Sequence, residues 1–191
     1  MEEKSITKTE LRDKISRKRR YITPTQKAKF DDQIYKNIIE MPEWKKAKNI
    51  FIYISTKEEV STIKLIEDCF GKKRIIVPKS HAKFNTLTLH EIKSFNDTSK
   101  GKYSILEPMP HTEIINPADV DLAIIPGVGF DKKGHRIGYG KAYYDGLSAH
   151  LKCTKIGLAY EVQIVDNIPA QEHDIPVNQI VTEKTIYRIN N

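Results

Sequence analysis

The amino-acid sequence predicts an α/β protein with a three-layer α/β/α architecture, in which a mainly parallel, open sheet carries helices on both faces. Three observations predict this class. Short apolar runs at residues 50–54, 74–77, 122–125 and 156–159 have the length of buried strands. Segments with apolar residues at helical spacing lie between them. Strands that form nearly continuous apolar runs are typical of a parallel sheet covered on both sides.

Two helices are predicted before the first strand. A capping hydroxyl at Ser5 or Thr7 begins a helix that continues to about residue 21. Thr23 followed by Pro24 begins a second helix, because the hydroxyl can cap the first turn and proline suits its first position. Pro42 ends or bends this helix. Within it, apolar side chains recur at helical spacing at residues 30, 34, 38 and 41.

The later elements follow from the same signals. Pro78 is expected to end the strand at 74–77, because proline has no amide hydrogen to donate to a neighbouring strand. Residues 96–119 are rich in Pro, Asn, Ser and Thr and are expected to be mostly loop. We further expect a helix at 62–70 before Gly71, a strand suited to the sheet edge at 87–92, a helix from about 140 to 150, and a late strand at 185–189.

The composition is that of a globular protein with an excess of positive charge. Hydrophobic residues make up 39% and charged residues 30% of the 191 residues, and the formal net charge is +7. These fractions indicate a folded chain rather than a disordered one. Residues 1–21 contain eight Lys/Arg and four Asp/Glu. Such a segment suits anionic partners, among them nucleotides and nucleic acids, and the plain alternative is a solvated helix face.

Other features of the sequence exclude or disfavour several classes of protein. No apolar stretch approaches the length of a membrane span, and the charged N-terminus lacks the apolar run of a secretory signal, so we expect a cytoplasmic protein that does not bind membranes. Cys69 and Cys153 have no metal-ligand spacing and are expected to be buried thiols. The aromatic residues are not interleaved with cations as a base-stacking surface requires, which disfavours a nucleic-acid partner.

Residues 126–145 carry the most distinctive chemistry of the chain. The segment follows the apolar run 122–125 and contains five glycines, four Lys/Arg residues, paired tyrosines and two aspartates. Glycines let backbone N–H groups approach an anion, cations neutralise its charge, and an aspartate can hold a magnesium ion that bridges phosphate oxygens. The segment therefore indicates a nucleotide-phosphate site. A glycine-rich hairpin turn with solvated charges is the alternative.

Two common phosphate-binding patterns do not fit this segment. A Walker A loop would need a glycine where His135 stands and a hydroxyl residue where Ala142 follows Lys141. The dinucleotide-binding fingerprint would need a third glycine at the position of Tyr143. The spacing of these glycines therefore matches neither pattern, and by itself it does not separate a phosphate site from a glycine-rich hairpin turn.

The segment does match the signature of another family at Pro126, Gly127, Phe130, Asp131, Gly134, Arg136, Gly138, Gly140, Tyr143, Tyr144 and Asp145. Shorter matches lie at 8–12, at 59–62, and at 173–178 with 181–183. Together these pieces span nearly the whole chain in the expected order, and the chain resembles the 5-formyltetrahydrofolate cyclo-ligase family, also called methenyltetrahydrofolate synthetases. Two positions depart from the signature: Ala142 replaces the usual glycine, and Gly146 stands where an arginine commonly follows.

The resemblance implies an ATP-dependent reaction that converts 5-formyltetrahydrofolate into 5,10-methenyltetrahydrofolate with release of ADP and phosphate. It implies ATP as co-substrate, Mg²⁺ as cofactor, and a small reduced folate, with or without a polyglutamate tail, as the binding partner. Residues 1–191 would form a single catalytic domain that acts as a monomer. The alternatives are another ATP- or phosphate-dependent enzyme with this fold and, less favoured, a basic nucleic-acid-binding module.

The resemblance also implies which residues contact ATP. Arg136 and Lys141 would be catalytic, since they would neutralise the β- and γ-phosphates. Lys8 and Arg12 would also contact phosphates, because their spacing places them on one face of a helix. The further ATP-binding residues would be Gly134, Gly138, Tyr139 and Gly140. A solvated basic stripe is the alternative for the helix residues.

The remaining implied roles concern the metal and the folate. Asp145 would be the main magnesium ligand and Asp174 a weaker second one, whereas a helix-surface and a turn aspartate are the alternatives. Glu59 would hold the pterin, because a carboxylate accepts hydrogen bonds from an amino-pyrimidinone edge; an acid stabilised near a helix N-terminus is the alternative. Tyr143 and Tyr144 would shape the folate pocket, with core packing as the alternative for at least one of them.

Three of the four matching pieces follow predicted strands. Residues 59–62 come after the strand at 50–54, the glycine-rich segment after the strand at 122–125, and Asp174 after the strand at 156–159. In open α/β sheets, ligands bind beyond the carboxyl ends of the strands. The sequence therefore predicts that these three pieces meet at a single site.

Overall fold

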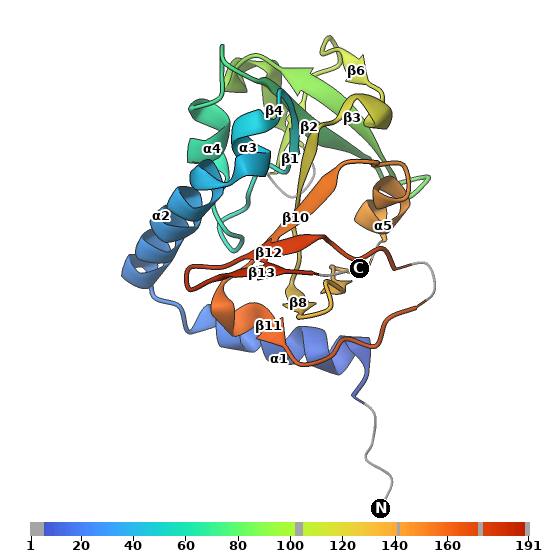
Figure 1. Cartoon of the computed structure of the whole chain (residues 1–191). Coiled ribbons are helices and arrows are strands. Elements are labelled where there is room, and N and C mark those ends of the chain that lie inside the picture. The colour runs from blue at the N-terminus through green and yellow to red at the C-terminus, as the bar shows by residue number, and fades with distance from the viewer. Residues whose placement is uncertain (1–5, 102–104, 141, 172–173, 190–191) are drawn as a thin grey trace, which may run out of the picture.

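The computed structural model describes residues 6–101, 105–140, 142–171 and 174–189. Its centre is an eight-stranded sheet with the order β13-β12-β10-β7-β1-β2-β3-β6. Helices cover both faces of this sheet (Figure 1). The predicted fold class, a mainly parallel sheet between helical layers, is confirmed.

The middle of the sheet is parallel and its edges are antiparallel. The parallel strands are β12 (Gln179–Val181), β10 (Thr154–Leu158), β7 (Leu122–Ile125), β1 (Asn49–Ile52) and β2 (Arg74–His81). The antiparallel strands are β13 (Ile186–Arg188) beyond β12, and β3 (Thr86–Ile92) with β6 (Ile114–Ile115) beyond β2. The four apolar runs of the sequence all lie in the parallel part, where both faces of a strand are covered.

Alternate side chains of the core strands enter two separate hydrophobic clusters. In β1, Ile50 and Ile52 point to one face of the sheet and Phe51 points to the other, and all three are fully buried. This alternation follows from the two-residue period of a strand. The first face is covered by α2 (Pro24–Glu40), α3 (Pro42–Lys46) and α4 (Ile63–Glu67), and the second by α5 (Tyr143–Ser148).

The two predicted helix starts are confirmed. The Thr7 side chain accepts a hydrogen bond from the Glu10 amide at 3.2 Å, and the Glu10 carboxylate accepts one from the Thr7 amide at 2.9 Å, at the start of α1 (Lys8–Arg20). Thr23 and Gln26 form the same reciprocal pair at the start of α2. Each pair satisfies two backbone donors that the first helical turn would otherwise leave free. Serine at position 5 lies outside the described residues.

A small second sheet and α1 form a separate layer at one end of the central sheet (Figure 1). The three strands of this sheet are β11 (Ile164–Val165), β8 (Gly129–Asp131) and β9 (Arg136–Ile137). Leu11 and Ile15 of α1 pack with Val128, Ile137 and Ile168 in their own hydrophobic cluster. The first part of the glycine-rich segment is therefore a β8–β9 hairpin rather than an irregular loop.

Two expectations about the strands are wrong. The strand at 74–77 continues through Pro78 to His81 and pairs with β3 along this whole length. Pairing of β1 with β2 ends at Ile76, so among the described residues Pro78 has a partner strand on one side only, and a missing amide donor is tolerated there. The strand at 87–92 is not at the sheet edge, because β6 pairs with it at Leu89.

Other boundaries shift by a few residues. The helix expected from residue 140 begins at Tyr143. Residues 96–119 contain more regular structure than expected, namely β4 (Thr98–Lys100), β5 (Leu106–Pro108), β6 and the 3-10 turn η3 (Pro117–Asp119). Strand β12 was not predicted, although its pairing with β10 extends the parallel core. Only three residues long, it offers too short a pattern to be assigned from sequence.

Both cysteines are free thiols, with Cys69 buried and Cys153 only partly so. The expectation of two buried thiols therefore holds for Cys69 alone. Within the described ranges, every helix is too short or too polar to cross a lipid bilayer.

Candidate active site

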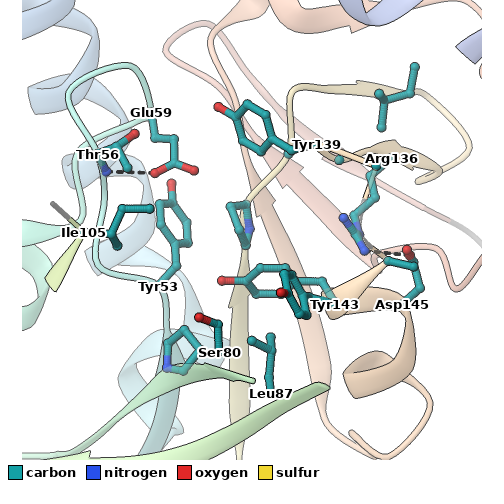
Figure 2. A pocket seen from close by; sticks show the side chains of 18 of the residues that line it. Tyr53, Thr56, Glu59, Ser80, Leu87, Ile105, Arg136, Tyr139, Tyr143 and Asp145 are labelled. Carbon is teal, nitrogen blue, oxygen red and sulfur yellow. Dashed lines mark hydrogen bonds and ion pairs between the residues drawn. The ribbon is translucent and has the colours of Figure 1, made fainter. Parts of the chain in front are cut away.

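A cavity of about 710 Å³ lies beyond the carboxyl ends of β1, β2 and β7. Its walls come from segments far apart in the sequence, as Figure 2 shows for the loop after β1, the β2–β3 hairpin and the glycine-rich segment. Residues of α1 and of the segment around Asp174 complete the lining. The three pieces predicted to meet beyond the strand ends, together with α1, therefore surround one cavity.

Arg136 and Asp145 form an ion pair on the glycine-rich wall (Figure 2). Arg136 Nη2 donates to Asp145 Oδ1 at 2.6 Å, and the side chains are 5% and 20% exposed. The guanidinium carbon lies 5.6 Å from the centre of the Tyr144 ring, a favourable cation–π distance. A Cβ atom on Gly138 would lie 3.1 Å from Arg136 Nη1, so a glycine there gives the guanidinium room. Arg136 is thus held in place by a carboxylate and an aromatic face.

The turn into α5 includes a non-glycine residue in left-handed conformation. Ala142 has φ 51° and ψ 15°, and Gly140 before it has φ 91°. Left-handed backbone costs a residue with a Cβ about 1–2 kcal/mol, whereas glycine adopts it freely. This geometry explains why the family signature usually has a glycine at position 142. At Gly146, the second departure, an added Cβ would meet none of the described atoms within 4 Å, so these atoms leave room for a larger residue.

Two cations of α1 face the cavity. Lys8 Nζ donates to Asp174 Oδ2 at 2.6 Å, and the Gln171 amide donates to the same oxygen at 2.9 Å. Arg12 Nε donates to the carbonyl oxygen of Gly138 at 2.8 Å. These contacts tie α1 to both the glycine-rich wall and the Asp174 segment. Arg12 and Arg136 both lie against Gly138, so their charges are on the same side of the cavity, and Lys8 lines the cavity beside Asp174.

Glu59 lies on the opposite wall, in the loop that joins β1 to α4 (Figure 2). Its Oε2 atom accepts a hydrogen bond from the Thr56 amide at 2.8 Å. The buried Tyr160 hydroxyl donates to Asp31 at 2.7 Å and lies 3.2 Å from the Glu59 carbonyl oxygen. Thr62 closes the loop by donating to the Tyr53 carbonyl at 2.6 Å. The backbone that carries Glu59 is therefore anchored at several points.

Tyr53 and Tyr144, which line the cavity, and the buried Tyr160 behind the Glu59 loop keep their protons. Burial raises the pKa of Tyr53 well above its ordinary value, and the Glu59 carboxylate adds to this effect. The same two causes, in the same order, raise the pKa of Tyr144. Burial and the hydrogen bond to Asp31 raise the pKa of Tyr160. Near neutral pH these hydroxyl groups act as hydrogen-bond donors and carry no negative charge.

Asp131, the other aspartate of the glycine-rich segment, is fully buried away from the cavity lining. Its carboxylate accepts hydrogen bonds from the amides of Lys133, His135 and Ile168 at 2.9 to 3.0 Å. The His135 ring nitrogen lies 3.1 Å from its second oxygen. Asp131 therefore holds the β8–β9 hairpin to the segment that follows β11, which is a structural task.

The predicted site residues within the described ranges are brought together, with one exception. Those lining the cavity are Lys8, Arg12, Glu59, Arg136, Gly138, Tyr139, Gly140, Tyr143, Tyr144, Asp145 and Asp174. Gly134 is not among them: it turns the hairpin with φ 88°, and its carbonyl oxygen accepts a hydrogen bond from Val177. A Cβ on Gly134 would lie 2.5 Å from the Val177 carbonyl oxygen. The predicted Lys141 lies outside the described residues.

Several lining residues had no sequence signal. Tyr53, Ser80, Leu87 and Ile105 reach the cavity from the strand ends, the β2–β3 hairpin and the segment before β5 (Figure 2). The Ser80 hydroxyl donates to the Glu107 carboxylate at 2.6 Å, which links this hairpin to β5. No motif relates these residues to one another, because they become neighbours only when β3 folds back on β2 and β5 packs beside them.

Comparison with known proteins agrees with this arrangement of motifs. The sequence pattern of the 5-formyltetrahydrofolate cyclo-ligase family matches residues 4–183. A mouse 5-formyltetrahydrofolate cyclo-ligase is 27% identical over 186 residues, which cover 91% of this chain and 92% of the mouse chain. A probable 5-formyltetrahydrofolate cyclo-ligase of Schizosaccharomyces pombe is 30% identical over 172 residues, covering 81% of this chain and 84% of the yeast chain.

Solved structures are similar over the same length. The NMR structure of Aquifex aeolicus 5,10-methenyltetrahydrofolate synthetase superposes with a TM-score of 0.87 at 35% identity, covering 97% of this chain and 94% of that one. A 5,10-methenyltetrahydrofolate synthetase from Mycoplasma pneumoniae superposes with a TM-score of 0.76 at 25% identity, covering 93% and 99% of the two chains. The chain described above, with its cavity at the strand ends, belongs to the 5-formyltetrahydrofolate cyclo-ligase family.

Proposed function

We propose that the protein uses ATP to cyclise 5-formyltetrahydrofolate to 5,10-methenyltetrahydrofolate, with release of ADP and phosphate. The observation that carries this proposal is the convergence of the family's sequence pieces on one cavity. Cations from α1 and β9 occupy one wall and the Glu59 carboxylate the opposite wall. A cavity with a cationic wall and a carboxylate wall suits a polyphosphate at one end and a pterin at the other.

The chemical problem is the poor leaving group of an N-formyl amide. Transfer of the γ-phosphoryl group to the formyl oxygen breaks the bond between the γ-phosphorus and its bridging oxygen and produces ADP and an iminium phosphate. The N10 lone pair then attacks the formyl carbon and closes the ring, and N10 releases its proton to solvent. Expulsion of phosphate, with its oxygen–carbon bond electrons, completes the conversion. In such transfers a protein contributes mainly positioning and charge neutralisation.

The residues of this chain would meet those two needs. Lys8, Arg12 and Arg136 neutralise the negative charge of the phosphates, and the backbone N–H groups of the glycine-rich turn approach the phosphate oxygens closely. Lys141 would add a further cation, as the family signature implies. Arg136 is pre-positioned by Asp145 and by the Tyr144 ring, so little reorganisation is needed when charge develops on the transferred group.

On the opposite wall, Glu59 would accept hydrogen bonds from the amino-pyrimidinone edge of the pterin. Tyr143 points into the cavity from the start of α5 (Figure 2), where its ring can pack against a flat bicyclic ligand. Tyr144 is packed deeper, with its ring 6.3 Å from that of Phe51, so it shapes the floor of the pocket. The ligand would be a small reduced folate, with or without a polyglutamate tail, bound by a monomer.

We also propose that Mg²⁺ enters with the nucleotide and is held by Asp145, with Asp174 as a second ligand. Both carboxylates line the cavity near the cations, and oxygen ligands suit this metal. The described residues contain no group of three or more His, Cys, Asp or Glu side chains able to hold a metal on their own. That donor set fits magnesium, which is commonly bound by one or two carboxylates together with phosphate oxygens and waters. The ion would supply charge neutralisation on the phosphates.

The proposal is tested by mixing the purified protein with Mg²⁺, ATP and 5-formyltetrahydrofolate and following the methenyl-folate absorbance band. We expect the band to grow with one ADP formed per molecule of product. If ATP is consumed on other phosphate acceptors while no band develops, a different ATP-dependent enzyme with this fold is the correct conclusion. Omission of ATP and, separately, chelation of Mg²⁺ serve as controls and should each abolish the signal.

A further inference from the structure

Arg19 is a buried cation that lies outside the cavity lining. It follows Arg12 by about two turns of α1 and is 7% exposed. Its Nη2 atom donates to Glu58 Oε2 at 2.6 Å and to the Tyr139 hydroxyl at 3.3 Å. The Nη1 atom is buried and has no hydrogen-bond partner among the described residues. A single guanidinium nitrogen thus joins two different loops.

The two loops form opposite walls of the cavity. Tyr139 lies between Gly138 and Gly140 of the glycine-rich segment, and Glu58 immediately precedes Glu59 in the loop after β1. Figure 2 shows Tyr139 and Glu59 facing one another across the upper part of the cavity. Under the proposed function, Tyr139 therefore belongs to the nucleotide half of the site and Glu58 to the loop that binds the pterin.

The position of Arg19 on the helix argues against a purely structural role. Leu11 and Ile15 form the buried stripe of α1, and Arg19 continues that stripe four residues further on. An apolar side chain is the usual occupant of such a position, because burying a guanidinium is costly unless it is fully paired. Here the pairing is incomplete, and the Glu58 side chain is 66% exposed. An apolar side chain at position 19 would therefore be expected to stabilise the fold at least as well as this arginine does.

We propose that Arg19 is a positioning residue that couples the two halves of the site. A ligand that shifts either loop toward its bound position would, through Arg19, shift the other, so that less free energy is needed to position the second loop for its ligand. By thermodynamic reciprocity, folate would raise the affinity for nucleotide by the same factor as nucleotide raises the affinity for folate. This inference depends on the proposed function for the identity of the two ligands.

Calorimetry with a non-hydrolysable ATP analogue and Mg²⁺, without and with saturating 5-formyltetrahydrofolate, measures this coupling. The ratio of the two dissociation constants is the coupling factor, and we expect about threefold to tenfold for the native chain, the equivalent of about one hydrogen bond. Glu58→Ala, which removes the acceptor, should bring the ratio close to one, although it changes the loop that does not touch nucleotide. Tyr139→Phe, which removes the hydroxyl from the other end of the contact, should do the same.

Glu67→Ala is the matched control, because it makes the same chemical change at an exposed position of α4 and should leave the coupling factor unchanged. If Arg19 only stabilised the fold, Glu58→Ala would lower the melting temperature and leave the ratio intact, which would overturn the inference. A native ratio of one would also overturn it, while leaving the proposed function standing if analogue and folate both bind. Failure of the native protein to bind the analogue at all would defeat both.

Discussion

Replacement of Ala142 by glycine should stabilise the protein. Ala142 has φ 51° and ψ 15°, the left-handed region, at the residue before α5. A Cβ in this conformation costs about 1–2 kcal/mol. Glycine removes that strain but gives the unfolded chain more freedom, which offsets about 0.4–1 kcal/mol. The free energy of unfolding should therefore rise by about 0.5–1 kcal/mol, or about 1–4 °C in melting temperature for a chain of this size.

Ala149→Gly provides the control for this substitution. Ala149 is exposed and has φ −64° and ψ −26°, the right-handed region, at the other end of α5. Glycine gains nothing there and should lower the free energy of unfolding by about 0.5–1 kcal/mol. Urea titrations of the three proteins, followed by circular dichroism, give both values. If the two substitutions shift stability in the same direction, Ala142 is not strained and the explanation of the signature glycine is wrong.

Further predictions concern catalysis, the hairpin turn and pH. Lys141→Ala and Asp145→Asn should each lower kcat/KM for ATP by about a hundredfold or more with an unchanged circular dichroism spectrum; near-normal kinetics in either variant would remove its assigned role. Gly134→Ala should lower the melting temperature, because the new Cβ would lie 2.5 Å from the Val177 carbonyl oxygen. The KM of this variant for ATP should stay within about twofold of the native value. A rise in KM without a loss of stability would show that Gly134 does contact the nucleotide. Burial and the nearby charge of Lys79 lower the pKa of His90. The unfolded chain therefore binds the proton more readily below about pH 6.5, so stability falls as the pH drops through that value. His90→Gln should flatten this decline in urea titrations between about pH 7 and pH 5, and an unchanged slope would show that His90 does not contribute.

Much of the central fold was predictable because its signals are local. The apolar runs of β1, β7 and β10 are continuous, and a strand that is apolar on both faces must lie in the middle of a sheet that is covered on both sides. The starts of α1 and α2 were predictable because a capping threonine and its partner three residues later interact within a single turn. In each case the residues that decide the structure are neighbours in the chain.

The wrong expectations concern features that depend on distant partners. Pro78 does not end β2, since the pairing of that part of the strand is supplied by β3 alone. Gly134 and Gly140 are both glycines of the same segment, but Gly134 turns a hairpin that packs against Val177, whereas Gly140 lines the cavity. Asp131 and Asp145 are likewise both aspartates of one segment, and only Asp145 faces the site. Residue type and spacing cannot separate such pairs, because what differs is the neighbour brought by another part of the chain.

The sequence by itself determined the fold class and the family resemblance, and it predicted which cations would neutralise phosphate, because these depend on local apolar patterns and on the chemistry of single side chains. Only the tertiary structure decided that Lys8 of α1 lies beside Asp174, that Arg136 is held by Asp145, and that Arg19 links Tyr139 to Glu58. Such contacts join positions up to 166 residues apart. These contacts form only after the sheet and its helices have packed and brought distant parts of the chain together. Local sequence patterns do not encode that packing.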